Sequence, residues 1–176
     1  MKKFLLSLVL CLCTITIGFA QNQQCKLHSK LAGIVTYINT YVGGESLRFV
    51  ESFAVNSNGS FVFKFPRVYS SDLFPISYMY GGLNISNSNT QITLMNIDGT
   101  LYTGENYNEY MGPSYNSKRS SGIILYIYAD SNCQVNGYSD GMNVSLNLRQ
   151  GWNAVKVQSN SMTTVSGSQG WNWGTD

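Results

Sequence analysis

The sequence predicts an all-β protein folded as an antiparallel β-sandwich. An unbroken apolar run over Ile123–Ala129 is typical of a strand buried on both faces in the centre of a sheet. Apolar and polar residues alternate strictly over Met142–Arg149, which is the period of a strand with one buried face. Glycine and asparagine recur at short intervals between such runs, and no helical period follows residue 20.

Residues 1–20 have the pattern of a cleaved export signal. Two lysines form a basic start, and 4–19 is nearly all apolar. Gly18 and Ala20 place small residues at the two positions that a signal peptidase reads, which predicts cleavage between Ala20 and Gln21. The mature chain is therefore expected to be secreted, periplasmic or held at the cell surface.

Two alternatives stay open for this segment. It could be an uncleaved membrane anchor, although the run is short for a spanning helix and the polar stretch 21–24 follows at once. It could also be a lipoprotein signal, since Cys11 and Cys13 lie in the apolar run, but neither follows the small residue that such processing usually requires. With cleavage, we expect no membrane span in the mature chain.

Cleavage would leave a chain without net charge. Lys2 and Lys3 leave with the signal, so the 11 basic and 9 acidic residues become 9 and 9. A neutral surface gives no electrostatic reason to bind nucleic acid or anionic lipid. Charged residues are 11% of the chain, against about 25% in typical soluble domains. Uncharged polar residues replace them, as is common on secreted β-proteins and on proteins that bind sugars.

The mature chain predicts one domain after a short leader. Residues 21–30 are polar and are expected to form a loose leader. Residues 31–176 predict one β-sandwich domain, which is long enough to bury a core. A sub-boundary in the polar loop 103–121 would instead give two small packed sandwiches.

The first predicted strand, 32–42, places Ile38 and the even-numbered residues on one face. Tyr37, Asn39 and Tyr41 fall on the opposite face.

A second strand is predicted over 47–55. Asn58-Gly59 is a strong hairpin signal, and it predicts pairing with 61–65, whose phenylalanines share one face. Pro66 should end that strand, because proline cannot donate a hydrogen bond to the ladder.

The middle of the chain is less regular. The stretch 73–80 is apolar and aromatic, and 91–97 predicts a short strand. Asp98-Gly99 predicts a second hairpin turn. The polar stretch 103–121 then predicts a long loop that is either functional or disordered.

The last third contains the clearest patterns. Asp140-Gly141 predicts a turn before the strand 142–149, whose apolar residues should face inward. The stretch 153–158 is predicted to be its hairpin partner. Trp152 is one residue out of phase with the inward valines, so it either faces outward or lies on a bulge.

Two cysteines survive cleavage, Cys25 and Cys133. Export implies an oxidising compartment, so they could form a disulfide, for which the chain-entropy model assigns about 4–5 kcal/mol at most. The alternative is two free thiols, one of them buried in a strand. Nothing in the sequence fixes their distance, so both alternatives stay open.

Two segments resemble known families. Residues 33–36, then 53–61 and Phe65-Pro66, resemble the prealbumin-like, carboxypeptidase-regulatory type of β-sandwich, with a similar opening strand and a "dGsF…P" hairpin. Residues 146–155 are similar to an "L-x-L-x-x-G-W-N-x-V" hairpin of uncharacterised exported proteins of Gram-negative bacteria. The resemblances imply a prealbumin- or immunoglobulin-like sandwich that serves as an exported accessory or adhesive module. Neither pattern brings catalytic residues.

Aromatic residues outside the predicted main strands are the best functional candidates. An exposed flat ring beside asparagine and serine is a surface on which a sugar ring stacks. The candidates are Trp152, Trp171, Trp173, Tyr107, Tyr110 and Tyr115. The alternative is that the tryptophans cap one end of the sandwich and are mostly buried.

The sequence argues against nucleophile–imidazole catalysis and against a zinc site. His28 is the only histidine and falls in the predicted leader, whereas a catalytic imidazole must be buried and oriented. One histidine and two separated cysteines do not supply the three or four ligands that zinc takes. Asp130, Ser131 and Asn132, with Asp140 and Asn143, offer oxygen ligands for calcium, but Asx turns explain them better. We therefore expect no metal and no cofactor.

A pair of carboxylates could still hydrolyse glycosides. The candidates are Glu45, Glu51, Asp72, Asp98, Glu105, Glu109, Asp130 and Asp140. Asp98 and Asp140 precede glycines and are better explained as turn residues.

The sequence therefore predicts a non-catalytic, exported binding or structural module of the cell envelope, with an unidentified envelope protein or glycan as its partner. A secreted carbohydrate-binding protein is the first alternative, and a small glycoside hydrolase is the second.

Overall fold

The computed structural model describes residues 22–44, 46–107, 111–117, 120–166 and 172–174. Strands dominate these residues, which confirms the predicted all-β, sandwich-like class. The strands are β1 (Asn22–Lys26), β2 (Val35–Gly43), β3 (Arg48–Ala54), β4 (Ser60–Lys64), β5 (Phe74–Pro75), β6 (Asn84–Ile85), β7 (Gln91–Leu101), β8 (Asn106–Tyr107), β9 (Pro113–Ser117), β10 (Ser120–Ala129), β11 (Cys133–Ser139), β12 (Met142–Leu148), β13 (Gly151–Gln158), β14 (Ser161–Val165) and β15 (Asn172–Trp173). Two helical turns, η1 (Ser70–Asp72) and α1 (Ile76–Tyr80), complete the fold.

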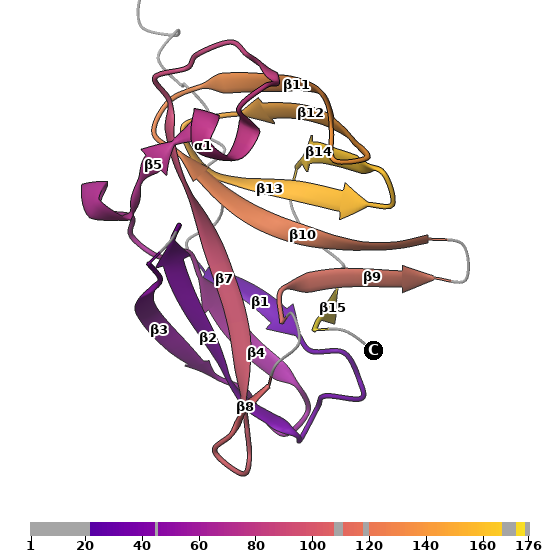
Figure 1. The fold of residues 1–176 in the computed structure, drawn as a ribbon. Coiled ribbons are helices and arrows are strands. Elements are labelled where there is room, and N and C mark those ends of the chain that lie inside the picture. Colours follow the sequence, from indigo (N-terminus) through magenta and orange to yellow (C-terminus); the bar gives the residue numbers. More distant parts are fainter. Residues whose placement is uncertain (1–21, 45, 108–110, 118–119, 167–171, 175–176) are drawn as a thin grey trace, which may run out of the picture.

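Most strands belong to one large, twisted sheet. Its order is β3-β2-β7-β10-β13-β14-β12-β11-β6, while β1 and β4 form a separate antiparallel pair. Neighbouring strands run antiparallel, except that β12 and β14 are parallel. Figure 1 shows an upper lobe containing β11 to β14 and a lower lobe containing β1 to β4, with the long strand β7 running through both.

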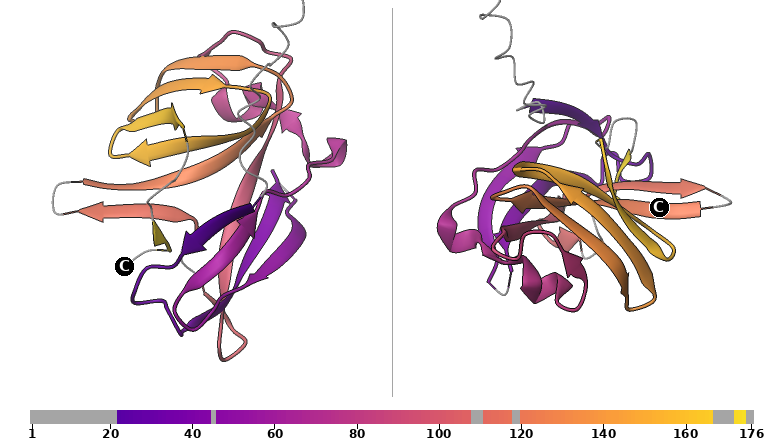
Figure 2. Two further views of the ribbon diagram at one scale, coloured as in Figure 1. Left: turned by 180° about the vertical axis from the view of Figure 1, so that it is seen from behind. Right: turned by 90° about the horizontal axis from the view of Figure 1, so that it is seen from above.

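Two apolar clusters fill the lobes. The lower cluster lies between the β1–β4 pair and the large sheet, and Figure 2 shows this pair lying across the lower part of the sheet. Its buried members are Leu27, Leu31, Val35, Ile38, Phe53, Phe61, Phe63, Met95, Ile97, Met111, Ile124, Tyr126, Ala154 and Trp173. The upper cluster is enclosed where the sheet curls over through β11, β12 and β14. Its buried members are Ile76, Tyr80, Ile92, Ile127, Ala129, Cys133, Val135, Val144, Leu146, Leu148 and Val155.

The clusters lie on opposite faces of shared strands. In β10, Tyr126 belongs to the lower cluster and Ile127 to the upper one; in β13, Ala154 and Val155 divide in the same way. Successive residues of a strand point to opposite faces, so a strand between two cores must be apolar at every position. This explains the unbroken apolar run and confirms the predicted central strand.

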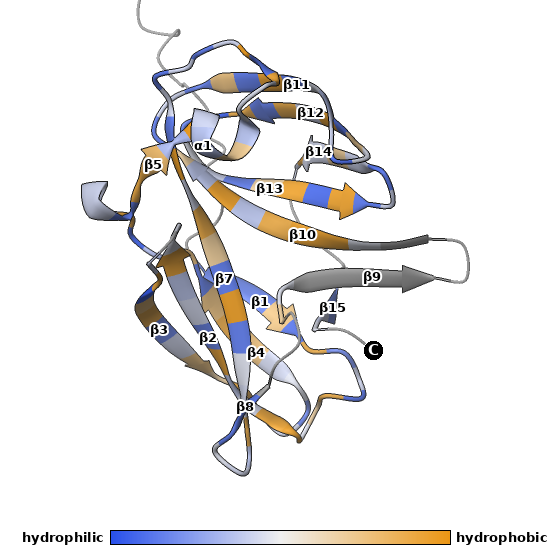
Figure 3. Cartoon of the chain, viewed as in Figure 1, coloured by the Kyte–Doolittle hydropathy of each residue, from blue (hydrophilic) through white to orange (hydrophobic). Residues whose placement is uncertain are grey.

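The alternation predicted for β12 is also confirmed. Val144, Leu146 and Leu148 are buried, and the residues between them are exposed. Figure 3 shows hydrophobic and hydrophilic bands alternating along strands of the sheet.

Residues 22–26 form β1, so the prediction of a loose leader is wrong for this segment. β1 pairs with β4 over its whole length, from Asn22 opposite Lys64 to Lys26 opposite Ser60. Leu27, which is 1% exposed, follows at once in the lower cluster. The polar side chains suggested a loose segment. The strand is ordered by backbone hydrogen bonds to β4, and the polarity of side chains does not predict such bonds.

The Asn58-Gly59 turn is present, but its two strands lie in different layers. Gly59 has a positive φ of 81° and its N–H donates to the Asn56 carbonyl at 2.8 Å. β3 pairs with β2, whereas β4 pairs with β1, so the predicted hairpin pairing is wrong. This arrangement lets Phe61 and Phe63 face the lower cluster from the layer opposite β3.

The two Asp-Gly dipeptides have different roles. Asp140 and Gly141 both have positive φ and join Ser139 to its partner Met142, which confirms the predicted turn. Asp98-Gly99 instead lies inside β7, where both residues pair with β2, so that predicted turn is wrong.

The predicted β12–β13 hairpin is also wrong, because β13 pairs with β10 and β14. The buried side chain of Asn153 organises the corner between β12 and β13. Its amide donates to the carbonyls of Arg149 at 2.8 Å and Gly151 at 2.9 Å, and its oxygen accepts the Arg149 N–H at 2.9 Å. The corner therefore satisfies its own backbone groups while the chain crosses to another part of the sheet.

The predicted loop 103–121 is not free of secondary structure. It contains β8 and β9, and β10 begins at Ser120; β9 pairs with β10. Backbone pairing thus orders part of this polar stretch, as it does β1.

Phe63 and Val62 test the lower cluster, because they are neighbours on β4 with opposite exposure. Phe63 is 0% exposed and Val62 is 45% exposed. We expect Phe63→Ala to lower the free energy of unfolding by about 3–5 kcal/mol and Val62→Ala to change it by about 0.5 kcal/mol or less, as measured by urea denaturation. Equal effects of the two substitutions would contradict the assigned faces of β4.

Candidate functional site

The aromatic candidates whose side chains are described pack largely against the core. Trp173 is 2% exposed and packs on Phe61 and Phe63, with ring centroids 5.1 and 4.7 Å away. Trp152 is half-buried on the face of β13 that carries Ala154, against Phe65 and Tyr128. Both placements agree with the alternative that the tryptophans are buried, and they argue against sugar stacking by Trp173.

The remaining candidates have no described side chains. Trp171 and Tyr110 lie outside the described residues. Tyr107 and Tyr115 are placed only as members of β8 and β9.

Several of the described carboxylates have structural partners. Asp130 accepts hydrogen bonds from the Gln91 N–H and the Ser131 hydroxyl, both at 2.9 Å, and so ties the end of β10 to the start of β7. Asp140 accepts one from Ser139 at 3.1 Å, at the opposite end of β11 from Asp130. Among the described residues, no group of three or more His, Cys, Asp or Glu side chains is arranged to hold a metal ion. Glu45 and Glu109 lie outside the described residues.

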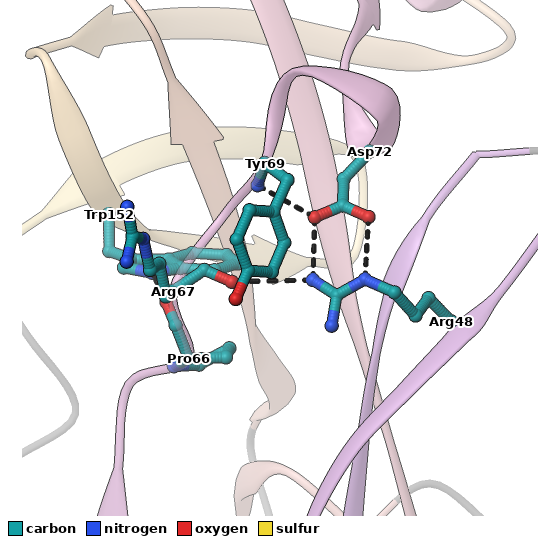
Figure 4. A network of polar contacts seen from close by, with 6 residues as sticks. All are labelled: Arg48, Pro66, Arg67, Tyr69, Asp72 and Trp152. Carbon is teal, nitrogen blue, oxygen red and sulfur yellow. Dashed lines mark hydrogen bonds and ion pairs between the residues drawn. The ribbon is translucent and has the colours of Figure 1, made fainter.

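Asp72 forms a bidentate ion pair with Arg48 of β3. The guanidinium donates to both carboxylate oxygens, Nε to Oδ1 at 2.8 Å and an Nη to Oδ2 at 2.6 Å, and the Tyr69 N–H adds a third bond at 2.8 Å. Figure 4 shows the fork-like geometry. The hydrogen bonds from Arg48 lower the pKa of Asp72 below its usual value, and Asp72 in turn raises the pKa of Arg48.

This network holds the segment 65–73, in which the chain passes from β4 in the lower lobe to β5. Arg48 also donates to the Arg67 carbonyl at 3.3 Å and lies over the Tyr69 ring, 4.8 Å from its centroid. The Trp152 indole N–H donates to the Pro66 carbonyl at 3.0 Å, so β13 holds the same segment from the other side. The network therefore has a structural role, joining the segment between β4 and β5 to both lobes.

The two cysteines are separate thiols in the structure. Cys25 packs against the lower cluster and Cys133 belongs to the upper cluster. Burial raises the pKa of Cys25 to about 12, so this thiol is protonated and a poor nucleophile at neutral pH. The structure thus agrees with the free-thiol alternative.

The strongest candidate for a binding surface lies on the open face of β3, β2 and β7. Ile38, Phe53 and Ile97 point from these strands into the lower cluster, so alternate residues point outward. The ladder registers arrange the outward residues in three rows across the strands. The rows are Ala54–Tyr37–Thr100, Ser52–Asn39–Asp98 and Phe49–Tyr41–Asn96. We call this surface the outer platform.

Hydrogen bonds fix the middle row. The Ser52 hydroxyl donates to Asn39 Oδ1 at 2.6 Å, and Asn39 Nδ2 donates to Asp98 Oδ1 at 2.8 Å and to Thr100 Oγ1 at 2.9 Å. Burial and the neighbouring Asp98 carboxylate raise the pKa of Tyr41, whose hydroxyl hydrogen-bonds to Asp98. The polar centre of the platform is therefore held in one arrangement.

Aromatic rings lie on both sides of this row. Tyr37 is 47% exposed and Phe49 is 54% exposed. Phe49 contacts Tyr41 edge to face, with centroids 5.6 Å apart. Tyr37 and Tyr41 are four residues apart on one strand, which separates their backbones by about 13 Å. The platform thus presents rings on either side of hydroxyl, amide and carboxylate groups.

Part of this surface was predicted from the sequence. Tyr37, Asn39 and Tyr41 were predicted to share the face opposite Ile38. Phe49 was not assigned to it, because its outward position depends on a register shift opposite Thr40 and Tyr41.

Comparison of the chain with protein-family models, curated proteins and solved structures gave no match. The resemblances found in the sequence therefore stay predictions. Within the described ranges, no helix has the length and apolar character needed to cross a membrane.

The Arg48–Asp72 contact predicts a pH-dependent contribution to stability. Because the folded-state pKa of Asp72 is lowered, this contribution is present above the unfolded pKa of about 3.9 and is lost as the pH falls through the folded pKa. We expect Asp72→Asn to lower the free energy of unfolding by about 1–3 kcal/mol at pH 7, with the difference from wild type shrinking below about pH 4. Urea denaturation at each pH measures it.

Asp140→Asn is the matched control, because Asp140 is exposed and asparagine tolerates its positive φ. A deficit of Asp72→Asn that stays constant from pH 7 to pH 2 would contradict the assigned ion pair.

Proposed function

We propose that the chain is an exported, non-catalytic β-sandwich that acts as a binding module at the cell envelope, with the outer platform as its ligand surface and an uncharged glycan as its ligand. The observation that carries this proposal is the exposure of Tyr37 and Phe49 beside a hydrogen-bonded row of polar groups.

The chemistry of the platform fits a sugar. The apolar face of a sugar ring packs on an aromatic ring, and its hydroxyls pair with amide, hydroxyl and carboxylate groups beside it. Tyr37 and Phe49 supply exposed rings, while Asn96 and Ser52 supply exposed polar groups. The mature chain is expected to be neutral, so long-range charge would contribute little to recognition.

A protein partner is the other occupant to consider. A stable protein interface buries about 800 Å² on each side and has an apolar centre with few charges. The platform has the reverse arrangement, because Asn39 and Asp98 occupy its centre and the rings lie at its ends. This arrangement favours a glycan over an envelope protein.

The positions of the carboxylates support a non-catalytic role. Asp72 is bonded to Arg48 and Asp98 to Asn39, and Asp130 accepts the Gln91 N–H. A glycosidase needs two carboxyl groups facing each other across a substrate cleft. The structural partners of these three groups favour binding over hydrolysis.

A glycan array probed with the mature protein tests the proposal. We expect binding to one or more uncharged glycans and a roughly tenfold weaker affinity for Tyr37→Ala, because one stacking contact is lost. Tyr138→Ala is the matched control, since Tyr138 is also an exposed strand tyrosine, 67% exposed, but lies on β11. It should bind as wild type does.

Two results would overturn the proposal. The first is no binding to any uncharged glycan on the array. The second is glycan binding that Tyr37→Ala and Phe49→Ala leave unchanged.

A further inference from the structure

A shallow pocket of about 540 Å³ opens at the end of the β11–β12 hairpin that lies away from its turn. Its lining includes Cys133 and Leu148, which face each other across the two strands and are 2% and 0% exposed. Both belong to the upper cluster, so the pocket rests on packed core. It does not include the residues of the outer platform.

Exposed polar side chains surround this base. Gln134 and Asn147 are cross-strand partners, and Asn132 and Arg149 extend the two strands by one residue. Ser86 fixes the edge of the pocket, because its N–H donates to the Gln134 carbonyl at 2.9 Å and its hydroxyl accepts the Gln134 N–H at 2.8 Å. The backbone at the pocket is thus ordered without a ligand.

The pocket presents an excess of hydrogen-bond donors and one positive charge. Arg149 is the charged side chain among the described lining residues, and within the described part of the chain no carboxylate forms an ion pair with it. Its backbone N–H donates to Asn153 Oδ1 at 2.9 Å, whereas its guanidinium has no hydrogen-bond partner among the described residues. Gln134 and Asn147 add side-chain amides beside it.

We propose that this pocket binds the carboxylate of an acidic sugar, such as a hexuronate. A guanidinium offers two parallel N–H donors that match the two oxygens of a carboxylate. One cation balances one carboxylate, whereas a phosphate dianion would be only half neutralised. The three amides of Asn132, Gln134 and Asn147 then suit the hydroxyls of the sugar ring. This inference concerns a different surface and an acidic ligand, so it is independent of the proposed binding of uncharged glycans.

NMR titration of the ¹⁵N-labelled mature protein with sodium glucuronate tests the proposal. We expect glucuronate to shift the side-chain amide signals of Gln134 and Asn147. Arg149→Gln should weaken the apparent affinity about tenfold or more, and Arg149→Lys should weaken it less, because the charge stays and the fork is lost. Arg149 is exposed, so these substitutions should leave the fold intact, which the remaining amide signals will report.

Three controls make the outcome decisive. Arg67→Gln removes the same charge from another exposed arginine outside the pocket lining and should leave the titration unchanged. Glucose tests the need for the carboxylate and should shift these signals much less. Inorganic phosphate tests the choice of anion and should bind more weakly.

The proposal is overturned if glucuronate does not shift these signals, if Arg149→Gln binds as tightly as Arg67→Gln, or if glucose or phosphate binds as well as glucuronate. Tyr37→Ala should leave the glucuronate titration unchanged, which separates this site from the outer platform.

Discussion

The structure depends on strands that are buried on both faces and paired along both edges. β10 pairs with β7 and β9 along one edge and with β13 along the other, while Tyr126 and Ile127 enter opposite clusters. Backbone groups placed between two apolar layers have no access to water, so the ladders must satisfy them. The two lobes therefore share their central hydrogen bonds as well as their apolar side chains. The sheet curls over through β11, β12 and β14 at one end, and the β1–β4 pair covers it at the other end. The shared strands join these two parts into one structure, although the chain has few charges.

The surfaces suited to binding follow from the same arrangement. β7 passes from the upper cluster, where Ile92 is buried, to the lower sheet, where Asp98 faces outward. Because Ile97 and Phe53 anchor the inner face of that sheet, the outer platform rests on a rigid support. The pocket has a similar basis, since Cys133 and Leu148 are fixed in the core beneath it. Both surfaces are thus preorganised, which reduces the conformational entropy that a ligand would have to remove.

The sequence predicted features that depend on local pattern and missed those that depend on distant partners. The alternation of β12 follows from burial of one face, and the apolar run of β10 follows from burial of both faces. The predictions made from these two patterns were confirmed. Asp140-Gly141 and Asp98-Gly99 have the same local signal, but only the first is a turn, because β2 pairs with β7 through Asp98 and Gly99. β1 was missed because its order comes from backbone pairing with β4. The pocket was missed because its residues come from segments that are separate in the sequence.

Because the two lobes share strands, we expect them to unfold cooperatively, and one measurement tests this directly. Leu146→Ala removes a side chain that is 2% exposed in the upper cluster, whereas Trp152 and Trp173 report on the lower cluster. Urea unfolding of this variant should be followed by tryptophan fluorescence and by circular dichroism. If the lobes unfold as one unit, both signals will move to the same lower midpoint, with a loss of about 2–5 kcal/mol. A fluorescence transition that stays at the wild-type midpoint while circular dichroism shifts would contradict the account, because the lower lobe would then be stable without the upper one.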